Sequence, residues 1–230
     1  MDSVGAEMSA EVLALAVACA TFTFILALLI AVFATGCGPL WLLSALSRCV
    51  RSCKKRKSFN WTEVDSLLYL GTVPREAEHL AELEKQGVAA VVTLNESWEL
   101  PLSFASIKDD FGMDHIHLPT PDFFAPSQAD IAEAVEFVSH HVEKGQAVYV
   151  HCNGGRGRSA VCVLCFLIAK RGMTAQEAFR LVRSKRKIAN MLAWGGLHKQ
   201  WMATKSFERS LKKKSPSEQV SVRQVVPAED

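Results

Sequence analysis

One short stretch of the chain, HCNGGRGRS at 151–159, combines residue types that together can do phosphate chemistry. Cys152 follows an apolar run typical of a buried strand, and an apolar, helix-like run begins near Ser159. Glycines between the two runs permit a tight turn whose backbone N–H groups point inward around an anion. The helix N-terminus adds partial positive charge, and the Arg158 fork matches two phosphate oxygens. The residues predicted to bind phosphate are Asn153, Gly154, Gly155, Arg156, Gly157 and Arg158.

Cys152 is the candidate nucleophile of this loop. The field that attracts phosphate also lowers a thiol pKa, so we expect a thiolate at neutral pH directly beneath the phosphorus atom. Ser159 is expected to donate a hydrogen bond to the sulfur and make it a better leaving group. A nucleotide-binding loop is disfavoured because the Walker lysine and its spacing are absent. Cys162 and Cys165 lie in an apolar run and are predicted to be core residues.

Strand-like and helix-like segments alternate along the chain and must position this loop. Such alternation predicts an α/β domain with a mostly parallel central sheet flanked by helices. Sites in these sheets form at the carboxyl ends of strands, which is where the loop at 151–159 lies. The predicted strands are 66–73, 88–95, 114–120 and 146–151, and the predicted helices are 74–87, 127–145, 159–171, 174–185 and 195–211.

The helix boundaries rest on particular residues. Pro74 is placed near the first turn of its helix, and Gly87 is placed at its end. Ser127 with Asp130 and Thr174 with Glu177 are predicted capping boxes at two further helix starts.

The stretch HCNGGRGRS fits HCxxGxxR[ST] and so resembles the cysteine-based protein tyrosine and dual-specificity phosphatases. The resemblance implies a protein tyrosine phosphatase-like domain, a phosphocysteine intermediate and no cofactor or metal. It also implies a general acid about thirty residues before the cysteine, and Asp122 in LPTPDFFAP has that position. Asp122 is then expected to protonate the leaving oxygen and later to activate water. Asp114 and Asp130 are weaker candidates, since helix capping explains Asp130.

LYLGTVP, VVTLNESWE and the Asp122 loop resemble one subgroup, the mitochondrial dual-specificity phosphatases that hydrolyse phosphatidylglycerophosphate. The resemblance covers roughly 62–186. It implies that Asn95, Glu96 and Glu99 form an acidic loop near the active site. Arg156 is also part of the resemblance. Its side chain either contacts a doubly anionic head group or points to solvent.

Two departures from the subgroup put its substrate contacts in doubt. Asn153 stands where the family commonly has a lysine. The segment SKRKIANMLAWGG at 184–196 does not repeat the arginine–proline pattern that precedes the family's last helix.

An uncharged run near the N-terminus predicts a membrane helix. Residues 12–34 contain no charge, and a helix of this length spans a hydrocarbon core of about 30 Å. A cleaved signal or transit peptide is disfavoured because basic residues are absent before the run. The basic cluster at 48–57 follows it and places the C-terminal domain in the cytosol or an equivalent compartment. Cys49 and Cys53 are either acylated or ordinary free thiols.

These features divide the chain into five predicted segments. They are a short acidic N-terminus (1–11), a transmembrane helix (12–34), an apolar then basic juxtamembrane segment (35–58), a dual-specificity phosphatase domain (59–211) and a disordered tail (212–230). We predict a single-pass membrane protein; the resemblance implies a mitochondrial membrane, and an endomembrane stays open. The anchor and the basic cluster are the predicted contacts with membrane lipid, and no nucleic-acid partner is predicted from a net charge of +2.

Two classes of function follow. The first is a membrane-anchored phosphatase that converts phosphatidylglycerophosphate to phosphatidylglycerol or, alternatively, acts on phosphotyrosine, phosphoserine and phosphothreonine in proteins. The second is a pseudophosphatase that only binds phosphate. The sequence opposes the second class, because it holds a nucleophile, an arginine and a candidate acid in Cys152, Arg158 and Asp122.

Overall fold

A computed structural model describes residues 58–102, 106–188 and 196–213, together with residues 19, 23, 24 and 27. Apart from those last four positions, the predicted membrane helix at 12–34 lies outside the described residues. The same holds for 1–11, for 35–57 with Cys49 and Cys53, and for 214–230. Within the described part of the chain, no helix is long and apolar enough to cross a membrane.

The described residues form a five-stranded sheet with the strand order β1-β2-β5-β3-β4. β1 pairs with β2 antiparallel, and the other neighbours are parallel, so the predicted mostly parallel sheet is confirmed. β1 was not predicted, since WTEVD buries only Val64 and carries no apolar run. The strands are β1 (Trp61–Asp65), β2 (Leu68–Thr72), β3 (Val88–Thr93), β4 (Asp114–His117) and β5 (Ala147–Cys152).

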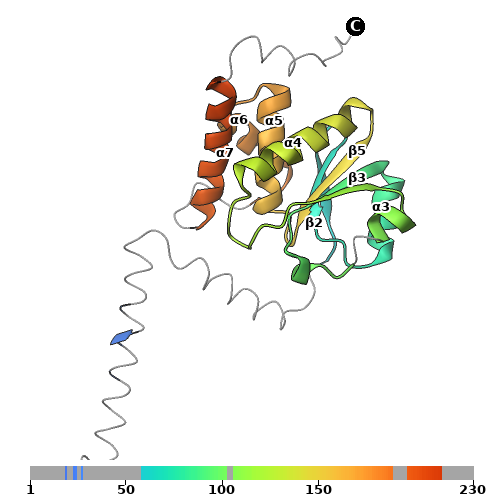
Figure 1. Ribbon diagram of the computed structural model, residues 1–230, viewed down its shortest axis with the longest axis horizontal. Coiled ribbons are helices and arrows are strands. Elements are labelled where there is room, and N and C mark those ends of the chain that lie inside the picture. Colours follow the sequence, from blue (N-terminus) through green and yellow to red (C-terminus); the bar gives the residue numbers. More distant parts are fainter. Residues whose placement is uncertain are drawn as a thin grey trace, which may run out of the picture.

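Helices cover both faces of this sheet, as Figure 1 shows. One face packs against α3 (Ala77–Lys85) and a π-helical turn at Ser106–Asp110. The other face packs against four helices and forms the larger hydrophobic core. They are α4 (Gln128–Glu143), α5 (Arg158–Arg171), α6 (Ala175–Lys185) and α7 (Gly196–Lys213).

The predicted helix starts at Ser127 and Thr174 are confirmed. Each hydroxyl accepts a hydrogen bond from the backbone N–H three residues later, and each box is closed by an acidic side chain. The prediction for Pro74 is wrong, because α3 begins only at Ala77. Glu76 before it has an extended backbone (φ −140°, ψ 153°), and the Arg75 backbone N–H donates to His79 Nδ1 at 3.0 Å.

β5 lies at the centre of the sheet, and all six of its residues are buried. Strands covered on both faces read as nearly continuous apolar runs, which explains the sequence AVYV before His151. α5 is buried from Arg158 to Ile168, and Cys162 and Cys165 are core residues, as predicted. The loop between β5 and α5 is therefore held by two rigid elements.

Candidate active site

The loop that joins β5 to α5 has the tight turn expected from its glycines. Cys152 is the last residue of β5, and α5 begins six residues later at Arg158. Gly155 has a φ of +58°, and a Cβ there would lie 2.2 Å from the carbonyl oxygen of Gly71 on β2. This position therefore excludes any side chain, and the loop packs directly against the neighbouring strand.

Cys152 is buried, yet its thiol is acidified. Burial raises the pKa of the thiol, but three opposing effects outweigh it and lower the pKa to about 7. They are the charge of Arg158, the Ser159 hydroxyl and the backbone N–H groups of Ser159 and Arg156. Ser159 Oγ lies 3.2 Å from Cys152 Sγ and donates to it, the contact expected from the sequence. A thiol with this pKa is about half ionised near neutral pH.

Arg158 is held by an acidic side chain from another loop. Its side chain is only 1% exposed, and its two terminal nitrogens bind Glu99 Oε2 at 2.5 Å and Glu99 Oε1 at 3.0 Å. Nη1 also donates to the Thr120 carbonyl at 2.8 Å. Such a bidentate pair fixes the plane of the guanidinium. Glu99, expected on an acidic loop near the active site, thus contacts the predicted phosphate-binding arginine directly.

Asp122 lies on the loop between β4 and α4, where the structure brings it to Arg158. Its Oδ1 is 3.2 Å from Arg158 Nη2, and the side chain is partly exposed. The next residue, Phe123, has a φ of +68°, an uncommon conformation for a non-glycine residue. The other two candidate acids lie elsewhere: Asp114 is 3.6 Å from His141, and Asp130 caps α4.

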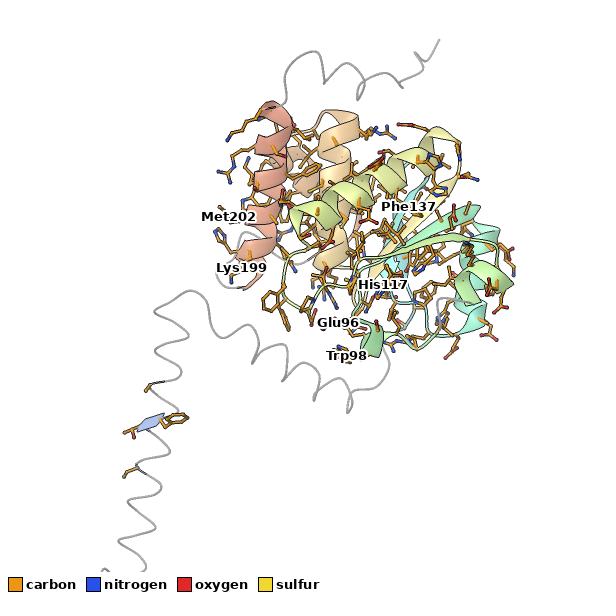
Figure 2. All side chains as sticks on the ribbon, viewed as in Figure 1. Glu96, Trp98, His117, Phe137, Lys199 and Met202 are labelled. Atoms are coloured by element: carbon orange, nitrogen blue, oxygen red, sulfur yellow. The ribbon has the colours of Figure 1, made fainter. Side chains whose placement is uncertain are left out.

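Asn95 and Glu96, the other two residues of the predicted acidic loop, lie on the segment that leads to Glu99. Asn95 is fully buried, and its side-chain amide has no hydrogen-bond partner among the described residues. The Glu96 backbone N–H donates to Glu99 Oε2 at 3.0 Å and caps the short 3-10 turn Ser97–Glu99. Figure 2 labels Glu96 and the exposed Trp98 on this loop.

The two polar side chains inside the phosphate loop face neighbouring segments. Arg156 is exposed, and its Nε donates to the Lys187 carbonyl at 2.9 Å. Asn153 accepts a hydrogen bond at Oδ1 from Arg75 Nη2 at 3.0 Å. Asn153 thus contacts the loop after β2, whereas Arg156 contacts the segment after α6.

Arg186 supports the loop from the end of α6, a role that the sequence did not reveal. Its Nε donates to the Gly155 carbonyl at 3.0 Å, and its terminal nitrogens bind Asn60 Oδ1 at 2.7 Å and Thr62 Oγ1 at 3.2 Å. These partners lie 31, 126 and 124 residues away along the chain. No spacing rule connects positions so far apart, so only the folded chain shows the contact.

His151, just before the nucleophile, is a buried neutral histidine. Burial first, then the charges of His115 and Arg158, lower its pKa to about 3. Its Nε2 is 2.8 Å from Thr93 Oγ1, which also lies 2.9 Å from His115 Nε2. This chain of hydrogen bonds ties the end of β5 to β3 and β4 without adding charge beneath Cys152.

A small apolar crevice of about 10 Å³, with room for about one water molecule, lies between the loop that follows β2 and the segment that follows Glu99. Val73 and Pro74 line one side, and Leu100, Pro101 and Leu102 line the other. Arg75 follows Pro74 directly, so an apolar surface and a cation adjoin each other near the phosphate loop.

Comparisons with known proteins agree with this geometry. The family described as "Polymorphic toxin system, DSP-PTPase phosphatase" matches residues 69–172. Phosphatidylglycerophosphate phosphatase PTPMT2 of Arabidopsis thaliana is 43% identical over 127 residues, which is 55% of this chain and 55% of that protein. The chain spans about half the length of the curated relatives it matches.

Two solved structures share the fold. Tk-PTP in its active form is 30% identical, with a TM-score of 0.58, over 65% of this chain and 96% of that chain. PTPMT1 in complex with PI(5)P is 25% identical, also with a TM-score of 0.58, over 65% of this chain and 95% of that chain.

Proposed function

Because the chain belongs to the cysteine-based dual-specificity and protein tyrosine phosphatases, we propose that it hydrolyses phosphomonoesters through a phosphocysteine intermediate. The observation that carries the proposal is the Cys152 thiol, whose pKa of about 7 makes it a nucleophile at neutral pH. Arg158 and Asp122 lie next to each other beside it, 3.2 Å apart. The nucleophile Cys152, the phosphate-binding Arg158 and the acid Asp122 thus lie together at the N-terminal end of α5.

In the first step, Cys152 Sγ attacks the phosphorus atom of a monoester held by the loop amides. The S–P bond forms as the bond to the leaving oxygen breaks, and protonated Asp122 gives its proton to that oxygen. Arg158 stabilises the charge on the transferring phosphoryl group. A substrate phosphate in the loop takes over the Arg158 nitrogen that Asp122 contacts in this structure.

In the second step, Asp122 accepts a proton from water while the water oxygen attacks the phosphocysteine. The S–P bond breaks, and phosphate leaves together with a regenerated thiolate. The Ser159 hydroxyl, 3.2 Å from the sulfur, stabilises the charge that returns to Sγ.

The proposed substrate is phosphatidylglycerophosphate, which would yield phosphatidylglycerol. Two observations support a lipid: the relative from Arabidopsis thaliana bears the name of that activity, and the solved PTPMT1 structure holds PI(5)P. The uncharged run at 12–34 supports anchoring in a membrane; whether that membrane is mitochondrial stays a prediction.

Phosphate release from the full chain in lipid–detergent micelles tests this proposal. Phosphatidylglycerophosphate is compared with a phosphotyrosine peptide, and Cys152→Ser serves as the blank. We expect the lipid to be turned over with the higher kcat/KM. A higher kcat/KM for the peptide would show that the chain is a protein phosphatase. No phosphate release from either substrate by a folded chain would overturn the catalytic proposal.

A further inference from the structure

Charge is divided unevenly between the two halves of the described domain. Residues 58–152 contain 16 acidic and 4 basic residues, whereas residues 153–213 contain 2 acidic and 14 basic ones. The second range begins with the phosphate loop and continues through α5, α6 and α7, which pack against one another. Figure 1 shows these three helices together at one side of the sheet, with α3 at the other. Positive charge therefore gathers on the side of the domain that carries the phosphate loop.

The C-terminal end of α6 brings part of this charge to the loop itself. Arg186, the C-cap residue of α6, donates from Nε to the Gly155 carbonyl at 3.0 Å. Arg156 Nε donates in turn to the Lys187 carbonyl at 2.9 Å. Lys185 and Lys187 flank Arg186 in the chain, and both are exposed. These two lysines therefore lie at the edge of the phosphate loop.

α7 brings a further cation to the same edge. A Cβ at Gly157, just before α5, would lie 3.0 Å from the side-chain amide of Gln200 on α7. Lys199 directly precedes Gln200 and is exposed. Arg183 is exposed on the last turn of α6, two residues before Lys185. The exposed basic residues beside the loop form a basic rim, which consists of Arg156, Arg183, Lys185, Lys187 and Lys199.

Carboxylates do not neutralise the basic rim within the described part of the chain. Arg156 binds a neutral carbonyl, and the Arg183 guanidinium lies 5.8 Å from the centre of the Phe179 ring, so both cations keep their charge. The ion pairs of this half of the domain involve other basic residues, namely Arg158, Lys170, Arg171, Lys205 and Lys212. Exposed cations gathered at one edge attract an anionic surface.

Trp98 adds an exposed aromatic side chain near the active site. It is 49% exposed and directly precedes Glu99, whose carboxylate binds Arg158. Figure 2 shows Trp98 and Lys199 at the same lower edge of the molecule. Tryptophan rings lie favourably among lipid head groups, and lysine and arginine side chains attract anionic lipid. A basic surface with an exposed tryptophan thus fits a membrane better than it fits a purely polar partner.

We propose that the basic rim and Trp98 form a docking surface for an anionic lipid bilayer, with the phosphate loop facing the head groups. The uncharged run at 12–34 is predicted to anchor the same chain, so a bilayer would lie within reach of this surface. Attraction between the rim and anionic lipid acts over about 8 Å at physiological salt, so the surface binds only when it lies against the membrane. The docking surface orients the domain, whichever phosphomonoester Cys152 attacks.

Lysine acetylation of the full chain tests the docking surface without measuring turnover. The chain is diluted from detergent into vesicles of phosphatidylcholine, alone or with about one third phosphatidylglycerol, and is treated briefly with a water-soluble acetylating reagent. Mass spectrometry gives the acetylation rate of each lysine. We expect the anionic vesicles to slow acetylation of Lys185, Lys187 and Lys199 about three- to ten-fold, and about 0.5 M NaCl to abolish the slowing.

Lys85 and Lys144 are the internal controls, because both are exposed at the opposite end of the sheet. They precede β3 and β5, which are parallel neighbours, whereas the phosphate loop follows β5. The six residues of β5 span about 20 Å between the two ends. Anionic vesicles should not slow the acetylation of either lysine.

A pair of matched double variants separates this surface from the net charge of the chain. Arg183→Glu with Lys187→Glu should remove most of the slowing at the rest of the rim. Lys85→Glu with Lys144→Glu changes the net charge by the same amount and should leave the slowing unchanged. Trp98→Ala should weaken the slowing to a smaller extent. Circular dichroism and thermal unfolding confirm that each variant is folded.

Three outcomes would overturn the docking surface: equal acetylation in both kinds of vesicle, slowing at Lys85 and Lys144 as large as at the rim, or an equal loss of slowing in the two double variants. Slowing by an oligonucleotide or a polyglutamate peptide, but not by the vesicles, would assign the rim to a nucleic acid or an acidic protein instead. A chain that shows the slowing but hydrolyses no monoester would leave the docking surface standing and contradict the catalytic proposal alone.

Discussion

Buried thiols lie both beside the N-terminal end of α5 and in its middle, and their acidities differ in opposite directions from that of an ordinary thiol. Cys152, beside the first residues of α5, has a thiol pKa lowered to about 7. Cys162 and Cys165, in the middle of the helix, have thiol pKa values raised above the ordinary value, and burial is the largest cause for both. All three side chains are buried, so exposure does not separate them.

The two regions differ in whether a positive charge and hydrogen-bond donors lie near the sulfur. Burial disfavours the thiolate at every one of these cysteines. At Cys152 the guanidinium of Arg158, the Ser159 hydroxyl and two backbone N–H groups outweigh it. The position of a cysteine therefore sets the reactivity of its thiol. At the helix N-terminus the N–H groups have no helical partner and can stabilise a thiolate.

The largest expected effect comes from exchanging the thiols themselves. Cys152→Ser should lower kcat by at least about 10⁴-fold, because a catalytic nucleophile is lost. Cys162→Ser should keep kcat within about three-fold and lower the free energy of unfolding by about 1–3 kcal/mol, because a hydroxyl is buried in the apolar core. Steady-state kinetics and denaturant unfolding measure both. A substantial loss of activity in folded Cys162→Ser would show that Cys162 also contributes to catalysis, contrary to this prediction.

A second prediction is that a double substitution raises the thiol pKa of Cys152 towards those of Cys162 and Cys165. Arg158→Met removes the cation, and Glu99→Gln in the same chain avoids leaving a buried carboxylate unpaired. The largest of the effects that lower the pKa of Cys152 is then absent, so this pKa should rise, and kcat/KM at pH 7 should fall about 10³-fold. The rate of alkylation by iodoacetamide against pH reports the thiolate.

The wild-type alkylation rate should rise with pH through a midpoint near 7, since deprotonation creates the reactive form. Glu99→Gln alone is the matched control. A midpoint that stays near 7 in the double variant would show that Arg158 does not set the pKa.

A third prediction concerns Asp122, the candidate general acid, which lies next to Arg158 at the N-terminal end of α5. Asp122→Asn should slow hydrolysis of alkyl phosphates about 10²-fold or more, because their leaving oxygen needs a proton. Hydrolysis of p-nitrophenyl phosphate, whose leaving group is stable as an anion, should slow far less. The ratio of kcat/KM for the two substrates is the measurement. Asp114→Asn is the control, and equal slowing of both substrates by Asp122→Asn would remove it as the acid.

The smallest effect is expected at Ser159. Ser159→Ala removes one of several donors to the sulfur, so the pKa of Cys152 should rise, though less than on loss of the Arg158 charge. Breakdown of the phosphocysteine should slow about three- to ten-fold, which a stopped-flow burst of the leaving group would reveal. A variant with no burst and an unchanged alkylation midpoint would contradict a role for this hydroxyl.

Much of the fold was predictable because it depends on local pattern. Continuous apolar runs identified β3 and β5, and the side chains of Ser127 and Thr174 identified two helix starts. β1 was missed because its pairing with β2 depends on a neighbouring strand and not on its own composition. The start of α3 was misplaced because Glu76, two residues after Pro74, has an extended backbone with a φ of −140° and a ψ of 153°.

The sequence by itself determined the phosphate loop: a cysteine after a buried strand, glycines where Gly155 meets the carbonyl of Gly71, and a serine and an arginine at the helix start. These residues are consecutive, so local backbone geometry brings them together. Only the tertiary structure decided what surrounds the loop. Glu99 reaches Arg158 across 59 residues, Arg75 reaches Asn153 across 78, and Arg186 reaches Asn60 across 126. Contacts between distant segments arise from the packing of whole elements, and no spacing along the chain encodes them.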